Sequence, residues 1–245
     1  MSAAPVGTTA SSHPTSSDAV AARATGLTKT YGRGETLVRA LDGVDLEIAA
    51  GRFTAIMGPS GSGKSTLMHC LAGLDTPTQG SVVVSGQELF AMDDTALTRF
   101  RRDHVGFVFQ AFNLLPMLTA RQNILLPLDL AGARVDEDWF DLLVDVLDIR
   151  DRLGHRPGEL SGGQQQRVAV ARGLVARPAI MFADEPTGNL DSHASAEVLG
   201  LLRRSVRELG QTVVMVTHDA GSAAYADDLV VIEDGRITSS GPVRR

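Results

Sequence analysis

The sequence has little cysteine, fewer basic than acidic residues, and no long apolar run. Among its 245 residues Cys70 is the single cysteine, which excludes a disulfide within one chain. No apolar stretch approaches the roughly 18–20 residues that a membrane-spanning helix needs. The sequence contains no basic segment followed by an apolar one, and we therefore expect no signal peptide. We therefore expect a cytoplasmic chain that reaches a membrane only through a partner.

The charge balance and the N-terminal composition further limit the function class and the domain organisation of the protein. With 23 basic and 29 acidic residues the net charge is −6, which argues against a general nucleic-acid-binding surface. A hydrophobic content of 43% allows a sizeable soluble core. Residues 1–23 are rich in Ser, Ala, Thr and Pro and lack apolar periodicity, so we expect a disordered tail followed by one folded domain over 24–245.

A glycine-rich stretch fits the phosphate-loop pattern G-x-x-x-x-G-K-[ST] in full. Its residues are Gly58, Pro59, Ser60, Gly61, Ser62, Gly63, Lys64, Ser65 and Thr66. An apolar run at 53–57 predicts a buried strand before it, and 67–72 predicts a helix after it. Backbone N–H groups of such a loop and helix N-terminus bind phosphate, Lys64 adds a point charge, and Ser65 is placed to bind Mg²⁺. This context disfavours the alternative, a flexible Gly/Ser loop with a surface lysine.

Two further groups of residues are candidate catalytic or binding sites. Asp184 and Glu185 follow an apolar run at 180–183, and two adjacent carboxylates there need a partner such as Mg²⁺. Asp184 would then bind the metal and Glu185 would polarise the attacking water, unless both merely form a turn before Pro186. Ser161, Gly162, Gly163 and Gln164 open a predicted helix as a second anion site, although a well-capped helix would look the same.

The remaining pattern alternates strands and helices, which predicts an α/β fold with a largely parallel sheet. Residues 27–31 are expected to form an edge strand, and the fold is expected to begin near Ala24. A helical subdomain is expected at about 111–165, in a stretch that Pro116 and Pro127 interrupt. Residues 229–237 carry a hairpin signal.

Six motifs in order resemble the ATP-binding subunit of an ABC (ATP-binding cassette) transporter, over about residues 24–240. They are the phosphate loop, Gln110, the signature Leu160–Gln164, Asp184-Glu185, Asn189-Leu190-Asp191 and His218. The resemblance implies a P-loop NTPase (RecA-like) core with a mainly parallel sheet, an antiparallel β edge region and an inserted α-helical subdomain. It also implies ATP as substrate, Mg²⁺ as cofactor, and a head-to-tail dimer of two such subunits.

The resemblance assigns roles to individual residues. Ser161, Gly162, Gly163 and Gln164 would meet the γ-phosphate bound by the other subunit. Gln110 would bind Mg²⁺ and sense the membrane partner, His218 would hold the γ-phosphate, and Asp191 would tie the two sites together. Tyr31 sits where the family stacks an aromatic ring on adenine, and Val38 would pack near the base. Both could instead be ordinary structural residues, as His218 could be a core histidine.

Several segments are similar to the macrolide-export and lipoprotein-release branch of the family, among them Asn113–Pro116 and Thr187–Asp191. This likeness implies an integral-membrane permease as partner, at the cytoplasmic face of the membrane, and export of a peptide, antibiotic or lipid-like substrate. The alternative is a force-transmitting complex that controls a cell-envelope enzyme without moving a solute. A soluble ABC ATPase acting on DNA or ribosomes is disfavoured. The apolar residues Phe112, Leu114, Leu115, Met117 and Leu118 would form either the permease groove or the subdomain's own core.

Overall fold

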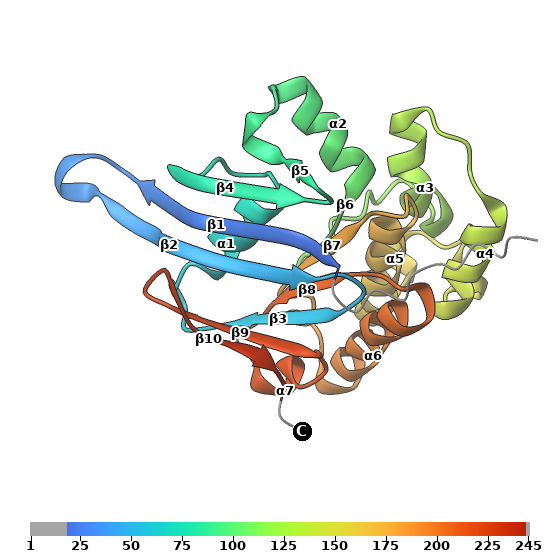
Figure 1. The fold of residues 1–245 in the computed structure, drawn as a ribbon. Coiled ribbons are helices and arrows are strands. Elements are labelled where there is room, and N and C mark those ends of the chain that lie inside the picture. The colour runs from blue at the N-terminus through green and yellow to red at the C-terminus, as the bar shows by residue number, and fades with distance from the viewer. Residues whose placement is uncertain (1–18, 244–245) are drawn as a thin grey trace, which may run out of the picture.

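Two β-sheets with α1 (Lys64–Leu71) between them form the centre of the protein (Figure 1). The computed structural model describes residues 19–243, so most of the expected tail lies outside the described residues. The smaller sheet has the strand order β2-β1-β4-β5 and the larger has the order β10-β9-β3-β8-β7-β6. This arrangement confirms the α/β class.

The smaller sheet is antiparallel. It consists of β1 (Val20–Tyr31), β2 (Val38–Ala49), β4 (Gln79–Val84) and β5 (Gln87–Glu88). The larger sheet is parallel from β9 to β6, and only β10 runs antiparallel to its neighbour β9. It consists of β3 (Phe53–Met57), β6 (Val105–Phe109), β7 (Ile180–Asp184), β8 (Val213–Val216), β9 (Asp228–Glu233) and β10 (Arg236–Pro242).

The helices surround the larger sheet. Besides α1 they are α2 (Asp94–His104), α3 (Ala120–Ala131), α4 (Glu137–Val146), α5 (Gly162–Leu174), α6 (Ser192–Leu209) and α7 (Ala220–Ala223). Short 3₁₀ helices lie at Gly34–Thr36, Leu89–Ala91, Arg150–Arg152 and Pro157–Glu159. No helix within residues 19–243 is long and apolar enough to cross a membrane.

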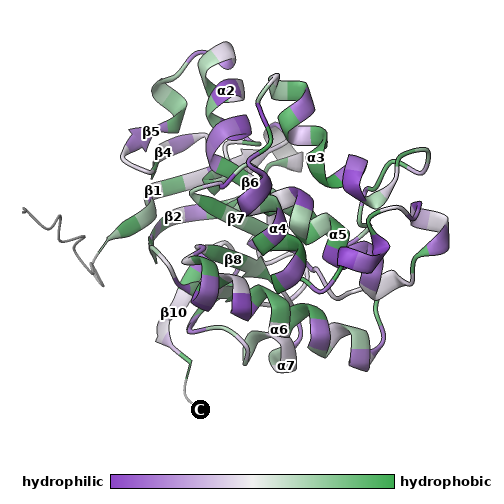
Figure 2. Cartoon of the chain, turned by 90° about the vertical axis from the view of Figure 1, so that its right-hand side faces the viewer, coloured by the Kyte–Doolittle hydropathy of each residue, from purple (hydrophilic) through white to green (hydrophobic). Residues whose placement is uncertain are grey.

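The larger sheet is buried on both faces. Along β7 the side chains of Ile180 and Phe182 pack toward α1 and the smaller sheet, whereas Met181 and Ala183 pack toward α3–α6. Alternating side chains of a strand point to opposite faces, so a continuous apolar run marks a strand covered on both sides. Figure 2 shows β7 and β8 in hydrophobic colours, while helix α6 alternates between hydrophobic and hydrophilic residues.

The N-terminal strand differs from the expectation. Strand β1 begins at Val20, before the expected start near Ala24, and it lies between β2 and β4 and is therefore not an edge strand. Ala22 and Ala24 are buried against the partner strands. Alanines carry little hydrophobic signal, so the first half of this strand looks like part of the polar tail.

The segment after β6 also departs from the expectation in detail. Pro127 lies inside α3 and does not end it, because a Thr119–Gln122 capping box fixes the helix start and buried Ile124 anchors it. The apolar residues that precede α3 differ in burial. Leu114 packs against the core, whereas Leu115 and Met117 are exposed.

Candidate functional site

The phosphate loop connects β3 to α1, and its glycines are sterically required. Gly63 has φ of +102°, a left-handed conformation that side chains disfavour, and a Cβ there would lie 2.3 Å from the Ala40 carbonyl oxygen. A Cβ on Gly58 would lie 2.0 Å from the Ile232 carbonyl oxygen. The buried Ser62 hydroxyl has no hydrogen-bond partner among the described residues. The loop is thus a tightly packed backbone cradle that opens onto a helix N-terminus.

Lys64 is the first residue of α1 and is buried. Its Nζ donates to the carbonyl oxygens of Gly58 at 2.9 Å and Pro59 at 2.7 Å. The ammonium is therefore fixed by the loop itself. A lysine ammonium has one further N–H donor, which remains for an anion such as a phosphate.

Ser65 and Asp184 meet at the carboxyl end of the sheet. The Ser65 hydroxyl donates to Asp184 Oδ1 over 3.5 Å. Burial raises the pKa of Asp184 above its usual range, and neighbouring Glu185 raises it too, against the opposing effects of His69, Ser65 and Lys64. A hydroxyl and a partly buried carboxylate are oxygen ligands of the kind that Mg²⁺ prefers, and a bound cation would favour the ionised form. These residues fit a magnesium site.

Glu185 and His218 lie next to this pair. Glu185 Oε1 lies 3.0 Å from His218 Nδ1. The backbone N–H of Glu185 donates to the Val216 carbonyl at 3.0 Å, and Glu185 has φ of +45°. A non-glycine residue in this conformation is held by its surroundings, which here aim a carboxylate at the end of β7 and β8. Both residues line a cavity of about 440 Å³ together with Thr187, Thr217 and Ser222.

Gln110, at the end of β6, is bound to Asn189. Gln110 Nε2 donates to Asn189 Oδ1, and Asn189 Nδ2 donates to the Gln110 carbonyl oxygen, both at 3.1 Å. Gly188 packs so closely that a Cβ there would lie 2.6 Å from Gln110 Nε2. Because the amide nitrogen is used, the amide oxygen is the end left for a cation. Asn189 belongs to the motif Asn189-Leu190-Asp191, and the sequence alone assigns it no role.

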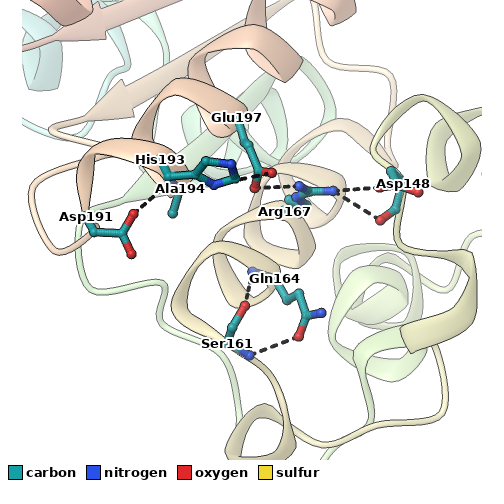
Figure 3. Close-up of polar contacts among 8 residues, drawn as sticks. All are labelled: Asp148, Ser161, Gln164, Arg167, Asp191, His193, Ala194 and Glu197. Atoms are coloured by element: carbon teal, nitrogen blue, oxygen red, sulfur yellow. Dashed lines mark hydrogen bonds and ion pairs between the residues drawn. The ribbon is translucent and has the colours of Figure 1, made fainter.

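The signature residues form the N-terminus of α5 (Figure 3). Ser161 Oγ accepts from the Gln164 N–H at 3.3 Å, and Gln164 Oε1 accepts from the Ser161 N–H at 2.9 Å. This capping box does not use the N–H groups of Gly162 and Gly163, which stay available to an anion. The prediction of a capped helix start is confirmed.

The N-terminus of α6 lies beside the signature. Asp191 caps α6 by accepting from the Ala194 N–H at 2.9 Å. Ser161, Gly163, Gln164 and Asp191 line one polar cavity of about 730 Å³, whose lining includes no residue of the phosphate loop. The phosphate loop and the signature therefore do not share this cavity.

Arg167, which the sequence analysis did not single out, joins these helices (Figure 3). Its guanidinium donates to Asp148 Oδ2 at 3.0 Å and to Glu197 Oε2 on α6 at 2.8 Å. It lies one helical turn beyond Gln164, on the same side of α5, and its side chain is only 13% exposed. The signal that could have found it is an arginine in the middle of a helix that is otherwise largely buried.

Tyr31 and Val38, the two residues expected at the nucleotide base, lie opposite each other on β1 and β2. Their exposed fractions are 43% and 60%. An exposed aromatic ring and an exposed aliphatic side chain side by side form a small apolar surface on which a flat ring can lie. Neither residue belongs to the core.

A phosphate loop with its lysine, a Ser–Asp pair and a Glu–His pair at the carboxyl ends of a parallel sheet define the class of phosphate-loop nucleotide hydrolases. Comparison with known proteins narrows the class. Residues 41–188 match the family described as ABC transporter. The chain belongs to this family.

Curated relatives and a solved structure agree with this assignment. The lipoprotein-releasing system ATP-binding protein LolD of Geobacter metallireducens is 47% identical over 215 residues, which cover 87% of this chain and 96% of that protein. The macrolide export ATP-binding/permease protein MacB of Bdellovibrio bacteriovorus is 46% identical over 214 residues, which cover 87% of this chain and 33% of that protein. A dimeric post-hydrolysis structure of the ATP-binding cassette MJ0796, bound to ADP and Pi, superposes with a TM-score of 0.80. It is 42% identical and covers 91% of this chain and 99% of that one.

These likenesses confirm three predictions. The fold is that of a P-loop ABC ATPase, the chain is an ATP-binding ATPase subunit, and it is of the LolD/MacB type. ABC ATP-binding subunits work on the cytoplasmic side of a membrane with a permease. The force-transmission alternative finds no support in these names.

Proposed function

We propose that this chain energises a separate integral-membrane permease from the cytoplasmic face of the membrane, for export of a peptide, antibiotic or lipid-like substrate. The relatives' names support this proposal. One belongs to a lipoprotein-releasing system, and the other combines an ATP-binding part with a permease on a protein of which this chain covers 33%.

The observation that carries the proposal is the placement of the two phosphate-binding helix ends. The phosphate loop lies between β3 and α1, whereas Ser161–Gln164 faces a different cavity beside Asp191. A helix N-terminus with unused N–H groups favours an anion that this chain does not itself bring there. Two copies packed head to tail would supply it, with each ATP between one copy's loop and the other's signature. We infer an ATP-dependent homodimer.

The phosphate loop would hold the triphosphate. The loop residues and Lys64 would bind its β- and γ-phosphates, and Tyr31 with Val38 would hold the base. Ser65, Asp184 and the amide oxygen of Gln110 would hold Mg²⁺, which neutralises charge on the phosphates when bound. The Ser65–Asp184 contact and the Gln110–Asn189 pair support this donor set.

Hydrolysis would depend on Glu185 and His218. Glu185 would accept a proton from the water that attacks the γ-phosphate, and His218 would contact that phosphate and orient the water. Ser161, Gly162 and Gly163 of the second copy would donate to the γ-phosphate, with Gln164 and Asp191 supporting that helix start. The 3.0 Å contact between Glu185 and His218 supports a joint role.

Co-purification with a permease tests the proposal. The tagged chain, expressed with the membrane protein encoded beside it, should be retained with that protein, and the pair should hydrolyse ATP faster than the free chain. Recovery of a fully active chain without any membrane protein would contradict it. A transport assay on the reconstituted pair would then distinguish export from force transmission.

A further inference from the structure

A charged pair holds the tyrosine that faces the proposed base site. The Tyr31 hydroxyl donates to Asp75 Oδ2 at 2.6 Å. Lys29 Nζ donates to Asp75 Oδ1 at 2.5 Å and to the Thr76 carbonyl at 2.7 Å. Lys29 and Tyr31 come from β1, and Asp75 follows the end of α1. This contact therefore joins the strand under the base to the helix that carries the phosphate loop.

The carboxylate of Asp75 is the group that makes the arrangement possible. It offers one oxygen to each of two donors, Lys29 and Tyr31, which lie two residues apart on one strand. The side chains of Lys29 and Asp75 are only 12% and 28% exposed, so the pair is partly shielded from solvent. Burial raises the pKa of Asp75, but hydrogen bonds from Lys29 and Tyr31 outweigh it, so the pKa lies below the usual range and the group stays ionised.

The ring of Tyr31 is fixed as well as its hydroxyl. Lys29 Nζ lies 4.9 Å from the ring centroid, over one face of the ring, at a distance typical of a cation–π contact. With one face against an ammonium and 43% of the residue exposed, a flat ligand has the other face to stack on.

We propose that Asp75 is a positioning residue for the nucleotide base: its two oxygens hold Lys29 and Tyr31 and so fix the Tyr31 ring for stacking on adenine. This inference rests on the proposed ATP site. Because Tyr31 is bound to Asp75, which follows the end of α1, the stack is held at a set distance from the phosphate loop at the other end of that helix. Asp75 itself does not touch the nucleotide.

Binding of ATP compared with inorganic tripolyphosphate tests the proposal by calorimetry on the full chain. Asp75→Asn keeps the shape but offers a single acceptor oxygen, so one of the two donors loses its partner. We expect it to weaken ATP binding about three- to tenfold, as loss of one hydrogen bond does. Tripolyphosphate, which has no base, should bind with unchanged affinity.

The double variant shows whether Asp75 acts through the tyrosine. Tyr31→Phe keeps the ring and removes the hydroxyl, and we expect an effect on ATP similar to that of Asp75→Asn. Adding Asp75→Asn to Tyr31→Phe should weaken ATP binding little further, because the contact is already lost. Additive effects would overturn the proposal, as would an equal loss of tripolyphosphate binding or an unchanged ATP affinity in Asp75→Asn.

Controls keep these outcomes separate from the proposed function. Asp103→Asn removes an exposed carboxylate paired with Arg102 and should change neither affinity. Wild type that binds no ATP would refute the ATP site itself. Tyr31→Ala with wild-type ATP affinity would refute stacking at Tyr31. Melting temperatures of all variants should stay close to that of wild type, so that a change in ATP affinity alone supports positioning.

Discussion

The phosphate-loop region and the signature region differ in how their polar groups are hydrogen-bonded. In the first, covering 58–66 with the residues at the ends of β7 and β8, the polar groups bond to one another. Lys64 binds the loop carbonyls, Ser65 contacts Asp184, and Glu185 contacts His218. In the second, covering Ser161–Gln164, the side chains of Ser161 and Gln164 are used in the capping box, and Ser161, Gly163 and Gln164 line an open polar cavity. The first is a preorganised centre, whereas the second is the region that we propose to receive a phosphate from another copy of the chain.

The largest effect is expected in the preorganised centre. Glu185→Gln keeps the shape and the contact to His218 but removes the proton acceptor. We expect turnover to fall about 10²- to 10⁴-fold, in the range of a lost general base, while ATP binding persists. Single-turnover kinetics measure the hydrolysis rate, and calorimetry measures ATP binding. With ATP present, light scattering should show a trapped dimer. Turnover near that of wild type would rule out Glu185 as the base.

The signature region can be broken without touching the loop. Ser161→Arg places a bulky cation at the start of α5 and should block the ATP-dependent dimer while ATP still binds. We expect ATP turnover to fall about 10²- to 10³-fold, the effect of losing one donor that stabilises the charge of the transition state. Light scattering with ATP, in a Glu185→Gln background, reads out the dimer.

A matched control separates lost assembly from lost capping. Thr119→Arg removes the same kind of capping box from α3, at a cost of about 1 kcal/mol. It should leave the dimer intact. If both variants dimerise equally, or both fail to, the signature has no special part in assembly and the comparison of the two regions fails.

A smaller effect is expected where Gln110 meets the loop before α6. Asn189→Ala removes the hydrogen bond that orients the Gln110 side-chain amide, and also the one to the Gln110 backbone carbonyl. We expect the Mg²⁺ concentration for half-maximal ATPase activity to rise about threefold, the effect of one net hydrogen bond, with little change in the maximal rate. Asn189→Asp keeps the acceptor for Gln110 Nε2 and should lie between wild type and Asn189→Ala. A fall in maximal rate alone would assign Asn189 another role.

The smallest effect concerns stability. Burial raises the pKa of Asp184 above its ordinary 3.8, so the stabilisation by its protonated form is complete below 3.8 and is lost as pH rises through the folded-state pKa. Without nucleotide or Mg²⁺, Asp184→Asn should therefore raise the melting temperature at pH 7 by about two degrees, and the gain should shrink toward pH 3.8. Asp103→Asn should show no gain, because Arg102 lowers the pKa of Asp103. A gain that does not depend on pH would exclude this cause.

Much of the preorganised centre could be predicted from the sequence because local rules determine it. The spacing Gly58–Ser65 is dictated by backbone geometry, and the continuous apolar run before Asp184 marks a strand buried on both faces. The start of β1 could not be predicted, since its alanines gain their burial only from β2 and β4. The prediction that Pro127 interrupts the segment after β6 is wrong for a similar reason. The capping box and the core contacts of α3 outweigh the low helix propensity of proline.

The contacts that orient the site residues lie beyond such rules. Asp75 meets Tyr31 across 44 positions, and Asn189 meets Gln110 across 79. Nothing in the local pattern of either residue indicates its partner, because the pairing follows from how strands and helices stack in three dimensions. Sequence reasoning thus identified the groups proposed to perform chemistry, and it could not identify those that hold them in place.

The hold of the loop on Lys64 has a kinetic consequence. A free lysine side chain has to lose rotational freedom when it binds a ligand, at roughly 0.5–1.5 kcal/mol. Here the hydrogen bonds to the Gly58 and Pro59 carbonyls already restrict the Lys64 side chain in the folded chain, before ATP binds. We therefore expect the association rate of ATP to be limited by diffusional encounter. The slow steps of the cycle should lie in the association of the two subunits.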